Sequence, residues 1–258
     1  MDMVLIGLAV GVLVGAVVGL VGAGGAIIAV PALVYVVGLE PAEAVPTSLI
    51  VVGLASLAGA LPRLRSDVSW PLVLLVGAAG IPASWLGAAA GARLDKDWLM
   101  LFFALIMIVA GLRMLLAAGV SNVQSQPGAN RWGQLALRGI PTGLAVGFLT
   151  GLLGVGGGFL IIPALTLLLR LPMHRAIGTS LVIIVINSAS GFAAHLDGLS
   201  IDWALTLSFA AAAMAASLGA ARIAHRLNDA VVSRVFAALI FAVALAVLLQ
   251  TVPALFRA

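Results

Sequence analysis

The chain has 258 residues, of which 63% are hydrophobic and only 9% are charged. A water-soluble domain of this length needs far more charge to cover its surface, so the composition predicts a polytopic membrane protein. The thirteen Lys and Arg residues give a net charge of +4. In so apolar a chain we interpret them as determinants of topology, and no nucleic acid partner is expected. The chain contains no cysteine, which excludes disulfides and thiol chemistry.

Ten apolar segments follow one another along the chain, five in each half, and they predict an all-α fold. They span roughly residues 3–22, 25–39, 46–62, 70–92 and 97–118, and then 134–152, 157–171, 177–194, 202–221 and 229–250. Most of them reach the ~20 residues that a helix needs to cross a bilayer. We therefore predict a first transmembrane repeat over 1–118, a polar linker over 119–133 and a second transmembrane repeat over 134–258.

A glycine-rich stretch occurs twice in the chain. Gly19 to Leu33 reads GLVGAGGAIIAVPAL, and Gly151 to Leu165, 132 residues later (151 − 19), reads GLLGVGGGFLIIPAL. Each copy leads into one of the two short apolar segments, which hold fifteen residues and an internal proline. Fifteen residues make about 22 Å of helix, less than the thickness of the hydrocarbon core. Short segments interrupted by Gly and Pro at matching places in two halves are typical of the binding site of a secondary transporter.

Loops at matching places in the two halves carry opposite charge. The basic residues are Arg63, Arg65, Arg170, His174 and Arg175, and the acidic residues at the matching places are Glu40, Glu43, Asp197 and Asp202. Because Lys and Arg are retained on the cytoplasmic side, the halves are expected to form inverted-topology repeats. Both termini are then predicted to lie outside, with the chain in a bacterial cytoplasmic membrane. Chance is the alternative, since each loop holds few charges.

The glycine breaks are the first candidate for binding a ligand. A helix that restarts at Gly24-Gly25 or at Gly156-Gly157-Gly158 leaves N–H groups without intrahelical partners. The helix dipole adds partial positive charge at that end, so the two breaks are expected to hold a small anion within the membrane. The alternative is close helix packing, because small residues let membrane helices touch.

Hydroxyl and amide side chains are the second candidate. They are Thr47, Ser48 and Ser56 in the first half, and Thr179, Ser180, Asn187 and Ser188 in the second. The Thr-Ser pairs open the third segment of each half, where their alternative role is to cap the helix. The other three residues lie about two turns deeper. They are expected to line the ligand path, and interhelical hydrogen bonding is the alternative.

Several other chemistries lack the residues they need. No Asp or Glu lies near the centre of an apolar segment, so a carboxylate proton relay is hard to place. The chain has no Gly-x-x-x-x-Gly-Lys-Ser/Thr motif for nucleotide phosphates and no His-Glu-x-x-His motif of a zinc protease. We therefore predict no enzymatic activity, no catalytic residues, no cofactor and no metal site.

Two further stretches accompany the doubled glycine motif. They are the pair Ala44-Val-Pro-Thr-Ser-Leu and Ala176-Ile-Gly-Thr-Ser-Leu, and the single Gly91-Ala-Arg-Leu before an apolar segment. Together these residues resemble the TauE/SafE family of membrane permeases, also described as sulfite or organosulfonate exporters. The resemblance implies secondary transport of a small sulfur-containing oxyanion, such as sulfite or a sulfonate. The alternatives are a permease or channel for another small solute and a non-transporting membrane scaffold. The direction of transport, the coupling ion and a homo-oligomeric state stay open.

Overall fold

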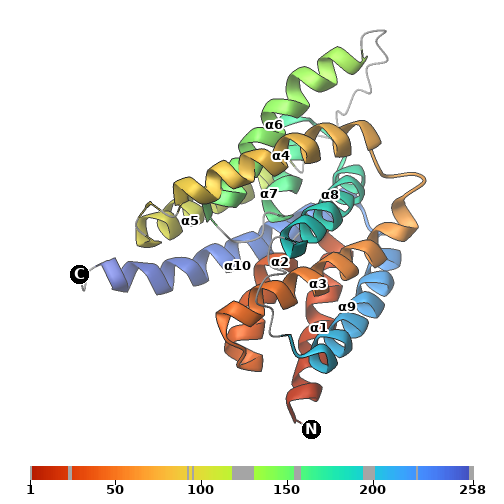
Figure 1. The fold of residues 1–258 in the computed structure, drawn as a ribbon. Coiled ribbons are helices and arrows are strands. Elements are labelled where there is room, and N and C mark those ends of the chain that lie inside the picture. The colour runs from red at the N-terminus through yellow and green to blue at the C-terminus, as the bar shows by residue number, and fades with distance from the viewer. Residues whose placement is uncertain are drawn as a thin grey trace.

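The structure is a computed structural model, and it describes residues 2–22, 25–91, 93–94, 96–117, 131–153, 158–193, 201–224 and 226–255. These residues form a bundle of helices (Figure 1). The elements are α1 (Asp2–Val21), α2 (Gly25–Ala32), η1 (Leu33–Val37), α3 (Pro41–Ala60), η2 (Leu61–Arg63), α4 (Trp70–Gly91), α5 (Lys96–Ala117), α6 (Arg131–Leu153), α7 (Gly158–Pro163), η3 (Ala164–Leu168), α8 (Met173–Ala193), α9 (Trp203–Ala224) and α10 (Asp229–Leu255).

Each of the ten predicted apolar segments is helical, so the predicted all-α membrane fold is confirmed over the described residues. Among the described residues, seven helices are long and apolar enough to cross a membrane, and shorter apolar helices run over Ile6–Val21, Ile28–Val37 and Gly158–Leu168. The largest differences from the predicted bounds lie at α3, which begins at Pro41 rather than near residue 46, and at α10, which ends at Leu255 rather than near residue 250. Proline suits the first turn of a helix, where its missing N–H has no intrahelical acceptor.

The two short segments share an unusual backbone course. Each passes from α-helix into a turn of π-helix just after its internal proline, Pro31 in α2 and Pro163 in α7. Both then end in the same way, because the N–H of Leu39 donates to the carbonyl of Leu33, and the N–H of Leu171 donates to that of Leu165, both at 3.0 Å. The two bonds are 132 residues apart in the chain, so the repeat that the sequence shows extends to backbone geometry.

The residues that end these segments also correspond. Gly38 and Arg170 both have left-handed backbone, with φ of 83° and 53° respectively. The first copy uses glycine, for which this conformation costs little, and the second copy holds an arginine in it. The same left-handed turn at both places reverses the chain toward the long helix that follows, α3 or α8.

Each half packs its first helix against the fourth helix of the other half. α1 lies along α9 and α6 lies along α4, and these are the two most extensive helix contacts in the fold. The first pairing places Gly7, Gly11, Gly15 and Gly19 against Leu205, Phe209, Ala213 and Ser217. The second places Gly143, Gly147 and Gly151 against Val76, Gly80 and Ser84. Both pairs are parallel, because the residue numbers rise together along each contact.

α3 and α8 run in opposite directions. Gly53 lies against Ser188, and Gly191 lies against Leu49. The end of α3 and the start of α8 therefore meet at one end of the molecule, which we call the basic end. It is made by residues 61–69, 173–177, 222–224 and 226–229, where α9 also ends and α10 begins. The third helices of the two halves thus point in opposite directions, and the opposite threading of the halves as a whole stays a prediction.

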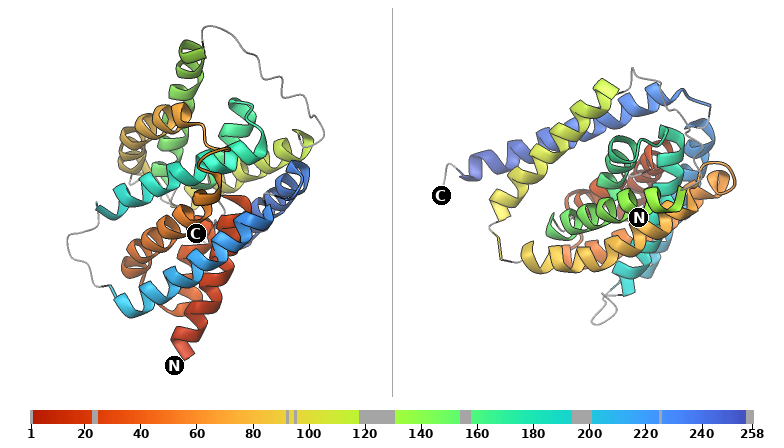
Figure 2. Two further views of the ribbon diagram at one scale, coloured as in Figure 1. Left: turned by 90° about the vertical axis from the view of Figure 1, so that its right-hand side faces the viewer. Right: turned by 90° about the horizontal axis from the view of Figure 1, so that it is seen from above.

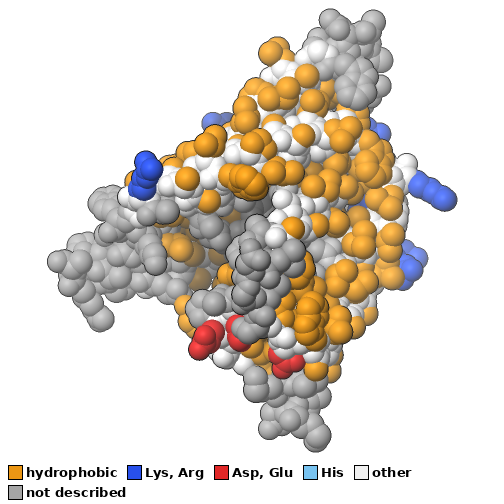
Figure 3. All heavy atoms as spheres, viewed as in Figure 1, with side chains coloured by type: hydrophobic (Ala, Val, Ile, Leu, Met, Phe, Trp, Pro, Cys, Tyr) orange, Lys and Arg blue, Asp and Glu red, His pale blue; other side chains and the backbone are white. Residues whose placement is uncertain are grey.

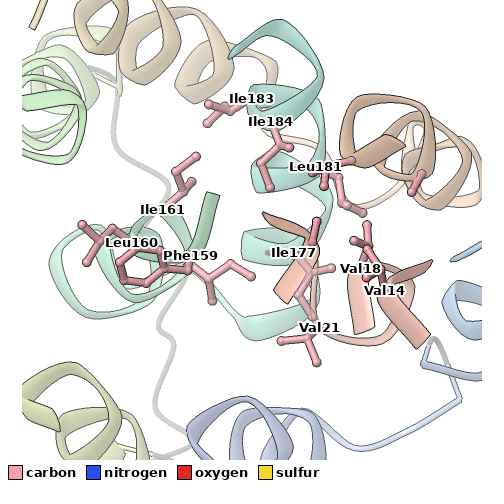
Figure 4. Close-up of a cluster of buried hydrophobic side chains, with 14 of the residues drawn as sticks. Val14, Val18, Val21, Phe159, Leu160, Ile161, Ile177, Leu181, Ile183 and Ile184 are labelled. Carbon is pink, nitrogen blue, oxygen red and sulfur yellow. The ribbon is translucent and has the colours of Figure 1, made fainter. Parts of the chain in front are cut away.

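The remaining pair, α5 and α10, lies together along one side of the bundle (Figure 2). The buried core lies between α1, α7 and α8, where Val14, Val18 and Ile177 gather with other branched side chains (Figure 4). α5 reaches this core through Phe103, whose ring meets that of Phe159 edge to face at 5.1 Å between centroids. The short helix α7 is buried along its whole length, so it is held as a central element rather than as a loop.

Candidate functional site

The described parts of the glycine breaks lie at the centre of the bundle. α2 and α7 contact each other, and Gly25 and Gly158, the first residues of these helices, are both buried. Gly24, Gly156 and Gly157 lie outside the described residues. A Cβ built on Gly25 would collide with Cγ2 of Val18 on α1. The start of α2 is therefore folded tightly against α1, so close packing accounts for at least one face of this glycine.

The two Thr-Ser pairs lie in the second turn of α3 and α8 rather than at their first residues. The hydroxyl of Ser48 donates to the carbonyl of Val45 at 2.7 Å, and that of Ser180 donates to Ile177 at 2.9 Å. These bonds turn back on the same helix instead of capping its first N–H groups. Thr47 is buried nearby in the same turn of α3.

Thr179 has a contact that Thr47 does not show among the described bonds. Its Oγ1 accepts a hydrogen bond from the N–H of Ser69 at 3.0 Å. A Cβ on the preceding Gly178 would lie 2.6 Å from the carbonyl oxygen of Asp67. This part of α8 therefore holds the connection between α3 and α4 in place at the basic end.

The deeper polar residues gather where α3 crosses α8. A Cβ on Gly53 would lie 3.0 Å from Cβ of Ser188, which shows how closely the two helices approach. Ser188 is buried, and Asn187 beside it is half-buried. Ser56, one turn beyond Gly53 on α3, has no exposed surface, and its hydroxyl has no hydrogen-bond partner in the structure. A buried hydroxyl without a partner is costly in an apolar setting, and a ligand oxygen would satisfy it.

Sequence reasoning missed Arg63, which it treated only as a topology signal. Its side chain is 2% exposed. One guanidinium nitrogen donates to the carbonyl of Gly59 at 3.2 Å and the other to that of Gly19 at 3.0 Å. Arg65, two residues further on, is exposed. Nothing in the local sequence distinguishes the two arginines, because only the packing of α1 against α3 buries the first of them.

Arg63 lines a cavity of about 400 Å³ at the basic end. The other lining residues come from three loops and the helices beside them: Ser66, Asp67, His174, Ile177, Ala224, Leu227, Asp229 and Val232. Nδ1 of His174 lies 3.3 Å from a carboxylate oxygen of Asp229, and both side chains are about half exposed. None of the nine predicted site residues that the structure describes is among those that line this cavity.

On the visible face, Asp and Glu side chains lie along the lower edge (Figure 3). Lys and Arg side chains project at the right-hand edge, where α3 leads into α4, and also at the upper edge and the upper left. The loops around Arg63 and His174, which the sequence assigns to one side of the membrane, meet at one end of the fold, beside the end of α9 and the start of α10.

The outer surface of the bundle and its broken helices indicate the class of protein. The long helices α4, α6 and α10 present large apolar side chains outward, such as Leu74, Leu137 and Leu249. Apolar surface of this extent belongs in a lipid bilayer. Two short, broken helices that contact each other inside the bundle, with polar side chains at the crossing beside them, are the architecture of a membrane transporter.

Comparison with known proteins gives the family. The family model of the sulfite exporter TauE/SafE matches residues 7–247, and the chain belongs to this family. A probable membrane transporter protein of Xylella fastidiosa (strain 9a5c) is 32% identical over 92% of both chains. The probable membrane transporter protein YunE of Bacillus subtilis is 30% identical, over 82% of this chain and 85% of its own length. The chain is thus an integral membrane transporter of the TauE/SafE family, and the relatives named here are described as probable membrane transporter proteins.

Proposed function

We propose that the protein carries a small sulfur-containing oxyanion, sulfite or a sulfonate, across the bacterial cytoplasmic membrane by secondary transport. The observation that carries the proposal is the meeting of α2 and α7 at the centre of the bundle, beside the crossing of α3 and α8. If the N-termini of the two helices face one region, they supply N–H groups and partial positive charge for an anion. The hydroxyl of Ser56 at the crossing would share the oxygens of the anion.

The division of the chain into two inverted repeats is part of the same proposal. It is supported by the matching turns at Gly38 and Arg170 and by the antiparallel course of α3 and α8. Oppositely oriented halves present the same binding groups to both sides of the membrane, as alternating access requires. The packing of α1 with α9 and of α6 with α4 means that each moving unit would contain helices from both halves.

The test is sulfite flux into proteoliposomes that contain the full chain. Gly25→Ala alone would be ambiguous, because its methyl group collides with Val18. The informative variant combines Gly25→Ala with Val18→Ala, which makes room for the new methyl group, and Val18→Ala alone is the matched control. We expect the control to keep most of the flux and the double variant to lose at least about tenfold, because a methyl group between α1 and α2 shifts the first N–H groups of α2 from the position in which they meet the anion.

Three results would contradict the proposal in different ways. Recovery of full flux in the double variant would show that Gly25 serves packing only. Absence of sulfite flux in the unaltered protein, with no competition by thiosulfate or sulfonates for any transported solute, would favour a permease or channel for another small solute. Absence of flux for every solute tested would favour a non-transporting scaffold.

A further inference from the structure

The cavity at the basic end is lined by charged side chains, and Arg63 is one of them. We propose that it is a vestibule in which small anions gather before they reach the centre of the bundle, and that Arg63 is its fixed positive group. This inference rests on the proposed anion transport, and it adds a second site at which the substrate is recognised. The fixed orientation of Arg63 and the position of the cavity beside the end of α1 support it.

Arg63 is held in a defined orientation. Its two bonds to the carbonyls of Gly59 and Gly19 use oxygens near the ends of α3 and α1. Carbonyls at the C-terminal end of a helix carry partial negative charge, so they favour a cation there. A guanidinium has five N–H donors in a planar fork, and the fork matches the oxygens of an oxyanion. The group is thus anchored on one side and lines the cavity on the other.

The vestibule adjoins the first glycine stretch. Gly19, which accepts the bond from Arg63, opens that stretch, and Gly22 closes α1 with φ of 85°. A Cβ on Gly22 would lie 2.7 Å from Cγ2 of Ile177, and Ile177 lines the cavity. The end of α1 therefore lies directly behind two residues that line the cavity, Arg63 and Ile177, so an anion beside Arg63 is separated from the end of α1 by this wall of side chains.

The two acidic residues that line the cavity reduce the positive potential of Arg63. Asp229 is paired with His174 at the rim, where both are half exposed. Asp67 is buried and interacts electrostatically with Arg63. Its carboxylate competes with any incoming anion for the same guanidinium. Removal of the negative charge at this position should strengthen anion binding, whereas removal of Arg63 should weaken it. A purely structural role for the Arg63–Asp67 pair predicts no such opposite effects.

The absence of native cysteine allows a direct probe of the cavity. Ser66 lines the cavity and is exposed, so Ser66→Cys introduces a single thiol there in the full chain. Its rates of reaction are measured with two methanethiosulfonates, one carrying a sulfonate and one carrying a trimethylammonium group. The ratio of the anionic to the cationic rate reports the local potential. Ala204→Cys, at the opposite end of the molecule on the first turn of α9, is the control position.

We expect Arg63→Gln to lower this ratio at Ser66→Cys at least about fivefold and to leave it unchanged at Ala204→Cys. Arg65→Gln removes the same charge from an exposed neighbour and should change the ratio much less. Asp67→Asn should raise the ratio with Arg63 intact, which keeps the test decisive even if Arg63→Gln fails to fold. Equal effects of Arg63→Gln and Arg65→Gln, no increase with Asp67→Asn, or a thiol that reacts with neither reagent would overturn the vestibule.

Sulfite flux into proteoliposomes separates this inference from the transport that it rests on. If the unaltered protein carries sulfite but the rate ratios do not respond to Arg63, the vestibule is wrong and the proposed transport stands. If the ratios respond as expected but sulfite is not carried, the cavity attracts anions and the proposed substrate is wrong.

Discussion

Ser56 and Ser217 are both buried near the middle of the bundle, and they differ in their hydrogen bonding. The hydroxyl of Ser217 on α9 donates to the carbonyl of Ala55 on α3 at 2.7 Å, whereas that of Ser56 has no partner. The first bond joins two helices. The second hydroxyl occupies a buried position at an energetic cost that the rest of the fold does not explain.

We therefore expect the two alanine variants to behave in opposite ways. Ser217→Ala should lower the free energy of unfolding by about 0.5–1 kcal/mol, because an interhelical bond is lost. Ser56→Ala should leave stability unchanged or slightly raise it, and it should lower sulfite flux. The measurements are thermal unfolding in detergent and flux at matched protein density. A Ser56→Ala variant with unaltered flux would remove this residue from the transport path.

At the scale of the elements, the glycines on one face of α1 and of α6 set how closely the helices approach. A Cβ on Gly15 would collide with the backbone of Ala213, and one on Gly151 with the backbone of Ser84. These obstacles are backbone atoms, which cannot rotate away as a side chain can. The glycines on these faces of α1 and α6 therefore fix both the spacing and the register of the α1–α9 and α4–α6 pairs.

Gly15→Ala and Gly151→Ala should each strongly reduce the yield of folded protein, since the paired helices must separate to admit a methyl group. Gly219→Ala on α9 is the matched control, because a Cβ there would meet no atom within 4 Å. It should be tolerated, and it should stabilise the protein by up to about 1 kcal/mol through helix propensity. Size-exclusion chromatography and thermal unfolding measure both effects. Similar stability of Gly15→Ala and Gly219→Ala would show that the helices are not held at this spacing.

At the scale of the whole molecule, the ends of the helices define two opposite sides. α10 begins beside the cavity at the basic end and runs away from it for 27 residues, about 40 Å of helix. The basic loops lie at the end where α10 begins. If that end faces the cytoplasm, as the retention of Lys and Arg predicts, Leu255 at the end of α10 lies near the outer side of the membrane.

A topology reporter fused after Ala258 should therefore show an extracytoplasmic location. The same reporter inserted between residues 119 and 130, in the predicted linker, should show a cytoplasmic one. The paired readout is needed because a single fusion can disturb insertion. A cytoplasmic signal after Ala258, together with an outside signal from the linker, would reverse the proposed orientation without changing the fold.

The order and extent of the helices were predictable from the sequence, because burial in lipid demands long apolar runs and satisfied backbone groups. The two broken segments were predictable because Gly and Pro interrupt them at matching places. The start of α3 at Pro41 was not, since the first-turn tolerance of proline leaves the boundary open.

The residues of the candidate site also fall into two groups, those that the sequence predicted and those that only the structure revealed. Ser56, Ser188 and the two broken helices were found because their residue types are unusual in an apolar run. The burial of Arg63, the cavity beside it and the pairing of α1 with α9 were decided by tertiary structure alone. They depend on which helices pack together although they lie 44 or more residues apart in the chain, as Arg63 and Gly19 do. Local patterns of hydrophobicity do not predict such contacts. The sequence by itself determined that this is a membrane protein with a doubled, glycine-broken core; packing decided which of its few charges turn inward.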